Sequence, residues 1–100
     1  MTIRGNLHAF DQFWVGGAST FSGVYVLWDD GELIYIGGTD EDGGVRARLT
    51  DHLYGGDPCL RHATHFQYEV TAMPWTRERE LILEFQAENL HSILVVSVQP

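Results

Sequence analysis

Residues 21–37 read Phe-Ser-Gly-Val-Tyr-Val-Leu-Trp-Asp-Asp-Gly-Glu-Leu-Ile-Tyr-Ile-Gly and carry the clearest structural pattern in the sequence. Two runs rich in β-branched and aromatic residues are separated by Asp29-Asp30-Gly31, which is typical of a β-hairpin. A three-residue loop that ends in glycine suits a type I turn followed by a left-handed residue. In that register Tyr25 lies directly opposite Tyr35, and facing side chains point to the same side of a sheet. The hairpin is therefore expected to bring two phenols together.

An amphipathic helix is predicted over residues 45–54, after a flexible acidic loop at 37–44. Apolar residues recur there at every fourth position and form one stripe. Arg48 and His52 sit one turn apart on a line beside that stripe. Both side chains are therefore expected on the same side of the helix.

The segments on either side complete an α+β domain. Leu7, Phe10, Phe13 and Trp14 recur at helical spacing, which predicts a helix over 6–15 capped by Asn6. Asp57-Pro58 is typical of a cap and first helical residue and opens a short turn through His62, and residues 65–71 alternate like a third strand. We expect a three-stranded antiparallel sheet flanked by helices.

The last strong element is a helix from Trp75 or Thr76 to Leu90, with Leu81, Ile82 and Phe85 as its buried stripe. Glu78 precedes these residues by three, four and seven positions, so it lies on the inward-facing side. Burial of a carboxylate there is costly without a partner or a cation. The stretch 92–98 fits either a strand or a packed extension.

Length and composition limit the possible classes of protein. One hundred residues predict one domain, and 44% hydrophobic with 12% aromatic residues indicate a globular chain. The single cysteine, Cys59, can form neither an internal disulfide nor a zinc cluster. Apolar runs are too short for a membrane span, and the N-terminus lacks an apolar signal core. We therefore expect a reduced, cytoplasmic protein with no membrane partner.

The charge balance argues against a broad basic surface. All six basic residues are arginine, and fourteen carboxylates give a formal charge of −8. Proteins that hold nucleic acid mainly by neutralising phosphates normally present a basic surface. Any nucleic-acid role must rest on a local arginine cluster, or on a protein partner or oligomer that supplies the affinity.

Several short motifs in order resemble the GIY-YIG nuclease family. Gly23-Val24-Tyr25 and Tyr35-Ile36-Gly37 match its two signatures, the first with valine for isoleucine. The segment 45–53 resembles its arginine helix, and Glu78-Arg-Glu-Leu-Ile82 matches its Glu-x-x-Leu-Ile. Asn89 stands near the place of the asparagine that often closes the motif set, without the family's preceding proline. The resemblance covers about residues 21–90, leaving 1–20 as an N-terminal extension packed on the domain and 91–100 as a C-terminal tail.

The resemblance implies a metal-dependent endonuclease that hydrolyses phosphodiester bonds in DNA. It assigns the catalytic roles to five residues: Tyr25, Tyr35, Arg48, His52 and Glu78. It favours Tyr25 for orienting or deprotonating the water and Tyr35 for positioning water or phosphate, and the reverse stays open. A phenol is a poor base at neutral pH, so nearby cations and a hydrogen bond from His52 are expected to lower its pKa. Substrate-binding residues are expected at Gly37, Arg46 and Asn89, with close approach of a phosphate at Gly37.

Glu78 is also the predicted metal ligand. One carboxylate together with waters and substrate oxygens suits Mg²⁺, and Mn²⁺ is a possible substitute. Arg48 would brace the phosphate with its planar donor fork. The sequence leaves the DNA structure and the oligomeric state open.

Two other functions remain open. A catalytically silent binding or adaptor module on the same fold would agree with the charge of −8 and the lack of lysine. A metal-dependent hydrolase of small molecules is a third hypothesis for the function. Each candidate residue also has a purely structural explanation, such as pairing of Arg48 with Asp51 on the surface.

Overall fold

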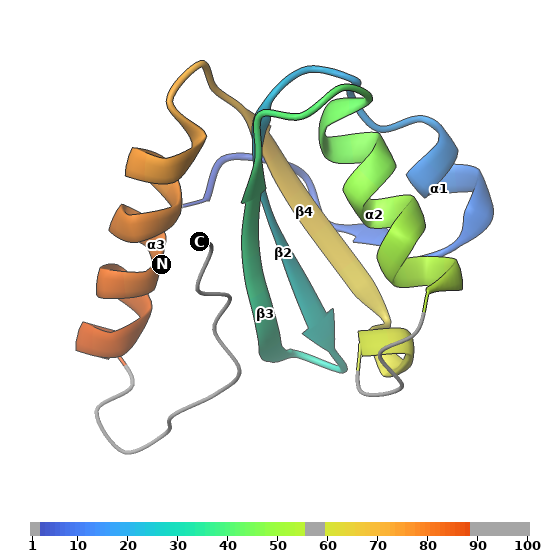
Figure 1. Ribbon diagram of the computed structural model, residues 1–100. Helices are drawn as coiled ribbons and strands as arrows, with labels where there is room; N and C mark the ends of the chain where they lie inside the picture. The colour runs from blue at the N-terminus through green and yellow to red at the C-terminus, as the bar shows by residue number, and fades with distance from the viewer. Residues whose placement is uncertain (1–2, 56–59, 89–100) are drawn as a thin grey trace.

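A four-stranded antiparallel sheet forms the centre of the computed structural model, which describes residues 3–55 and 60–88. In the described residues the strand order is β1-β4-β2-β3, with α1 and α2 on one face and α3 on the other (Figure 1). The elements follow one another along the chain as β1 (His8–Ala9), α1 (Gln12–Gly16), β2 (Gly23–Asp29), β3 (Glu32–Thr39), α2 (Gly44–Tyr54), the 3-10 helix η1 (Leu60–His62), β4 (His65–Val70) and α3 (Pro74–Glu88). The α+β class is confirmed, whereas the expected number of three strands is wrong.

The fourth strand comes from the segment that was predicted to be helical from residue 6. His8 and Ala9 pair with Phe66 and His65 of β4, so the backbone is extended there. The helix begins only after Asp11, whose side chain accepts a hydrogen bond from the Trp14 N–H at 3.0 Å. Aspartate is a preferred N-cap, and it competes successfully with Asn6 because the intervening residues gain strand partners.

The hairpin turn is shorter than predicted. Asp29 pairs with Glu32, and the two-residue turn between them has positive φ at Asp30 (50°) and Gly31 (87°), as a type I′ turn requires. The register shifts between Leu27 and Trp28, where Ile34 is the extra residue of a bulge in β3.

This turn and bulge change the partner of Tyr25. Tyr25 pairs with Gly37 and not with Tyr35, which instead faces Leu27, so the predicted direct pairing is wrong. The displacement is two residues, an even number, and it leaves both tyrosines on the same side of the sheet.

Alternation along the central strands divides the core between the two faces. Val24, Val26 and Ile36 pack with Leu81 and Phe85 of α3. The opposite face packs against α1, α2 and η1 through ten buried residues: Phe10, Val15, Ala18, Tyr25, Leu27, Val45, Leu49, Leu60, Ala63 and Phe66. The helix predicted over 45–54 is confirmed, and its stripe lies on the tyrosine face of the sheet.

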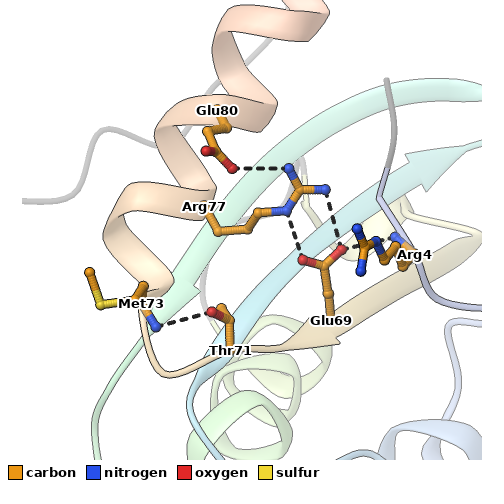
Figure 2. A network of polar contacts seen from close by, with 6 residues as sticks. All are labelled: Arg4, Glu69, Thr71, Met73, Arg77 and Glu80. Atoms are coloured by element: carbon orange, nitrogen blue, oxygen red, sulfur yellow. Dashed lines mark hydrogen bonds and ion pairs between the residues drawn. The ribbon is translucent and has the colours of Figure 1, made fainter.

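A polar network joins α3 to the sheet and to the N-terminal segment (Figure 2). Arg77 donates two hydrogen bonds to Glu69 of β4, from Nε to Oε2 at 2.7 Å and from Nη2 to Oε1 at 3.3 Å. Arg77 Nη1 also donates to Glu80 at 3.2 Å, and the Arg4 backbone N–H donates to Glu69 at 3.0 Å. Because the Arg77–Glu69 pair is partly buried and uses two donors, it fixes α3 on this face.

Three predictions lie outside the described residues, namely the cap at Asp57-Pro58, Asn89 and the tail at 91–100. Within residues 3–55 and 60–88, no helix has the length and apolar character needed to cross a membrane.

Candidate functional site

Four of the predicted catalytic residues form one contact cluster on the α2 side of the sheet. The Tyr25 hydroxyl is hydrogen-bonded to His52 Nε2 at 2.8 Å. The rings of Tyr25 and Tyr35 stack with centroids 6.0 Å apart, and the Tyr35 and His52 rings meet edge to face at 4.8 Å. The Arg48 guanidinium interacts with the Tyr25 hydroxyl by hydrogen bonding and by charge. We call these residues the tyrosine cluster.

Regular backbone periodicity positions the cluster. Tyr25 and Tyr35 come from neighbouring strands and point to one face, diagonal to each other. Arg48 and His52 lie four residues apart on α2, so both side chains project from one side of the helix. A strand pair and one helix therefore supply all four groups without a contribution from a long loop.

Gly37 makes room for the stacked phenols. A methyl group at this position would lie 2.6 Å from the hydroxyl and ring carbon Cζ of Tyr25 and 2.8 Å from Cε2 of Tyr35. The missing side chain thus allows Tyr25 to lie across β3. On this side of Gly37 the space is filled by tyrosine, so the predicted approach of a phosphate would have to use another side of the residue.

Burial controls the ionisation of Tyr25, whose side chain has no exposed surface. Burial and the neighbouring Tyr35 raise the pKa of Tyr25, and the Arg48 guanidinium lowers it by a smaller amount. The resulting pKa lies above its ordinary value, opposite to the expected lowering. Tyr25 is therefore protonated at neutral pH and can act as a hydrogen-bond donor or acceptor, but not as a phenolate base.

Arg48 connects the buried hydroxyl to the surface. Its side chain is 30% exposed, and Nη1 lies 3.5 Å from Asp51 Oδ2. Burial lowers the pKa of Arg48, but Tyr25, Tyr35 and Asp51 raise it, with a net increase. The guanidinium thus keeps its charge and its planar set of donors at the boundary between core and solvent.

Glu78 is buried but lies on the α3 side of the sheet. Its residue is 6% exposed, and its Oε2 atom has no hydrogen-bond partner. Burial alone raises the pKa of Glu78 to about 7. An orphaned carboxylate oxygen fits one ligand of a hard cation, although no group of three or more candidate ligands occurs within the described residues.

The sheet separates Glu78 from the tyrosine cluster. Gly38 faces Pro74 and Trp75 at the start of α3, whereas Gly37 faces Tyr25. The structure therefore brings together Tyr25, Tyr35, Arg48 and His52, and it places Glu78 on the opposite side of the sheet, with α3.

The predicted substrate-binding residues have mixed outcomes. Arg46 donates from Nε to the Ala18 carbonyl at 2.8 Å, so part of its guanidinium holds the segment before β2. Its residue is exposed, and its contact with DNA stays a prediction. Asn89 is outside the described residues.

Two groups of residues near the site were not predicted from the sequence. The Trp75 ring lies 3.3 Å from the position of a Gly38 Cβ, and its Nε1 donates to Asp40 at 3.3 Å. His8, Trp14 and Tyr68 line a pocket under α1. Tyr68 shares the alternation of Phe66 in its strand, which is the one sequence signal that could have placed it on the tyrosine face.

Comparisons of the chain with protein-family models, curated proteins and solved structures gave no match. The motifs and the geometry of the site are therefore the basis for a proposed function.

Proposed function

We propose that the protein is a metal-dependent endonuclease of the GIY-YIG type that hydrolyses phosphodiester bonds in DNA. The observation that carries the proposal is the convergence of Tyr25, Tyr35, Arg48 and His52 from separate elements into one hydrogen-bonded and stacked cluster. Phosphodiester hydrolysis requires an activated water and stabilisation of the charge on the phosphoryl oxygens. A guanidinium can stabilise that charge, and an imidazole or a phenol can orient or activate the water.

The residues of the tyrosine cluster differ in solvent exposure, and this difference indicates which of them can contact a substrate. Tyr25 is completely buried, whereas Tyr35 and His52 are partly exposed. We therefore assign Tyr35 and His52 to the attacking water and treat Tyr25 as a positioning residue that orients His52 and Arg48. This reverses the roles that family similarity favours for the two tyrosines. Arg48 holds the phosphate oxygens and stabilises the charge that develops on them.

Glu78 is the proposed ligand of Mg²⁺, or of Mn²⁺ in its place. Its buried, unpartnered oxygen supports this role because a cation would offset the cost of the buried charge. Such an ion would supply charge stabilisation for the departing oxygen. A single carboxylate agrees with the tendency of Mg²⁺ to keep several of its waters.

The formal charge of −8 requires a further source of affinity for DNA. We propose that a protein partner or an oligomer supplies it, since the described basic side chains of the cluster amount to Arg48 alone.

The decisive experiment is a cleavage assay on plasmid, branched and single-stranded DNA at low salt with Mn²⁺ or Mg²⁺. Arg48→Ala and Glu78→Gln should each abolish nicking, because they remove the phosphate contact and the metal ligand. Arg79→Ala and Glu32→Gln are matched controls on exposed residues and should cleave like wild type. Cleavage that persists in both site variants would refute the proposal.

The two tyrosines can be separated by removing one hydroxyl at a time. Tyr35→Phe should reduce cleavage with little change in the free energy of unfolding, because Tyr35 is partly exposed. Tyr25→Phe should lower both the cleavage rate and the free energy of unfolding. It also removes the buried hydrogen bond to His52, which contributes about 1 kcal/mol. Equal stability of the two variants would contradict this assignment of roles.

A binding or adaptor module on the same fold is the second candidate. The negative charge and the complete burial of the Tyr25 hydroxyl favour it. This function is supported if no DNA substrate is cleaved even when a cell extract supplies a partner, while the folded state is intact by circular dichroism.

A further inference from the structure

A pocket of about 450 Å³ lies between α1 and the sheet, on the face that carries the tyrosine cluster. This size is within the range of small-molecule sites in proteins. We call it the α1 pocket, and its lining consists of His8, Phe13, Trp14, Gly16, Gly17 and Tyr68.

The walls of the α1 pocket are aromatic and in part exposed. His8 and Trp14 stack with ring centroids 4.8 Å apart and an interplanar angle of 21°. Phe13 meets Trp14 edge to face at 5.2 Å, and these two side chains are 77% and 44% exposed. Adjacent exposed aromatic rings beside a cavity are typical of a binding surface.

The lining selects against a charged ligand. None of the six lining residues has a carboxylate, ammonium or guanidinium group. His8, Trp14 and Tyr68 have the polar side-chain atoms of the lining, and the rings provide flat surfaces for stacking. The chemistry therefore fits an uncharged planar heterocycle better than a phosphate.

Strand register connects the α1 pocket to the tyrosine cluster. Tyr68 of β4 pairs directly with Tyr25 of β2, so both side chains lie on the same face of neighbouring strands. Neighbouring strands are about 4.8 Å apart. The α1 pocket and the tyrosine cluster with Arg48 therefore lie on the same face of the sheet, which a bound nucleotide chain would follow.

We propose that the α1 pocket binds an unpaired nucleobase of the DNA substrate, which makes single-stranded, flapped or mispaired DNA the preferred substrate class. This inference rests on the proposed nuclease function for the identity of the natural ligand. Stacking of bases on aromatic side chains contributes affinity that does not depend on basic residues, as a chain with a charge of −8 requires.

The test is a titration of the ¹⁵N-labelled full chain with adenosine and, separately, with inorganic phosphate, followed by NMR. Adenosine should shift the Trp14 indole signal and the amides of Gly16 and Gly17, and leave the Trp28 and Trp75 indoles unchanged. Inorganic phosphate should not shift the pocket signals. Absence of these shifts with adenosine, or equal shifts with phosphate, would overturn the proposal.

Substitutions at three exposed aromatic residues provide two tests of the α1 pocket and one matched control. Trp14→Ala should weaken adenosine binding about tenfold, because it removes one stacking surface. Phe13→Ala should also weaken adenosine binding, because Phe13 lines the same pocket. Phe13 is exposed, so its removal leaves the core intact. Tyr54→Ala, at an exposed aromatic residue of α2, should bind like wild type. Wild-type affinity in both pocket variants would rule out the site.

The outcome is independent of the cleavage assay. Nucleoside binding requires neither metal nor catalysis, so adenosine can bind at α1 even if no DNA is cleaved, and in that case only the nuclease proposal fails. Cleavage without nucleoside binding would remove the α1 pocket and retain the nuclease. Pocket signals that move on dilution of the protein, and not with adenosine, would identify a second copy of the chain as the occupant and overturn the proposal.

Discussion

Among single residues, Glu78 combines a titratable carboxyl group with burial and an oxygen that has no hydrogen-bond partner. Burial raises its pKa to about 7 in the folded protein, from 4.5 for an exposed glutamate. The folded state therefore holds a proton that the unfolded state has already lost between these pH values. As pH rises through this window, the protein must lose stability.

We predict that the free energy of unfolding falls by about 3 kcal/mol between pH 4.5 and pH 8 because of Glu78. Glu78→Gln should lack this fall and should be more stable than wild type at pH 8. Urea unfolding of wild type and Glu78→Gln at pH 4.5 and pH 8 measures these free energies. The pKa of Glu69 is lowered, because Arg77 and the Arg4 backbone outweigh the effect of burial. Titration of Glu69 therefore changes the stability at lower pH, and it does so equally in wild type and Glu78→Gln. Parallel pH profiles for the two proteins would contradict the prediction.

Metal binding should be visible as stabilisation at pH 8. A ligand at ten times its Kd adds about 1.4 kcal/mol, so Mn²⁺ or Mg²⁺ should raise the Tm of the wild type by several degrees. Glu78→Gln should not respond, and the wild type should respond less at pH 5.5, where Glu78 is protonated. Calorimetry checks the assignment, and equal heats from the two proteins would exclude Glu78 as the ligand.

A glycine substitution tests the packing under the tyrosine cluster. Gly37→Ala places a methyl group 2.6 Å from the Tyr25 hydroxyl, so the phenol must move, at a cost of about 1–3 kcal/mol. Gly16→Ala is the matched control, because nothing lies within 4 Å of its new methyl group. Thermal unfolding should separate the two variants, and equal Tm values would mean that Tyr25 has room to shift.

At the scale of elements, the contact between α3 and β4 depends on one arginine. Arg77→Met removes a partly buried pair that uses two donors to Glu69, and it leaves that carboxylate with fewer partners. We expect a loss of about 2–3 kcal/mol in the free energy of unfolding. Glu80→Ala removes only an exposed ion pair with the same arginine and should cost less than about 0.5 kcal/mol. Similar losses in the two variants would place the stabilising interaction elsewhere.

The elements were predictable where side-chain periodicity determined them. The two-residue turn alone would move the register by one residue and put Tyr25 and Tyr35 on opposite faces of the sheet. The bulge at Ile34 moves the register by one more residue, so the net shift is even and both tyrosines stay on the predicted face. The bulge at Ile34 has no local signal in the sequence. The positive φ of Asp30 does have one, because Asp-Gly favours a two-residue type I′ turn. β1 has only two residues, too few to show any alternation.

The proximity of Tyr25, Tyr35, Arg48 and His52 was predictable from the sequence, but their access to solvent was not. Helical spacing correctly put Glu78 on the buried side of α3 and placed Arg48 beside His52. The complete burial of the Tyr25 hydroxyl depends on α2 and β3 together, so no local pattern could indicate it. The α1 pocket combines Tyr68 with residues more than fifty positions earlier in the chain.

On the scale of the whole molecule, the formal charge of −8 should limit the salt dependence of DNA binding. With phosphate contacts from Arg46 and Arg48 alone, a plot of log K against log salt should have a slope of about −2. Fluorescence anisotropy with labelled DNA and the Glu78→Gln protein measures this slope. A slope steeper than about −5 would require more cationic contacts than these two residues provide.

The strand order also determines when the sheet can form during synthesis. β4 is the last of the described strands in the chain, yet it lies between β1 and β2. The hairpin of β2 and β3 can pair as soon as both leave the ribosome, whereas β1 has no partner until residues 65–70 emerge. A nascent chain halted before β4 would expose the open edge of β2, a surface on which another chain could add a strand. The sheet of the described residues is therefore complete only once β4 has joined it.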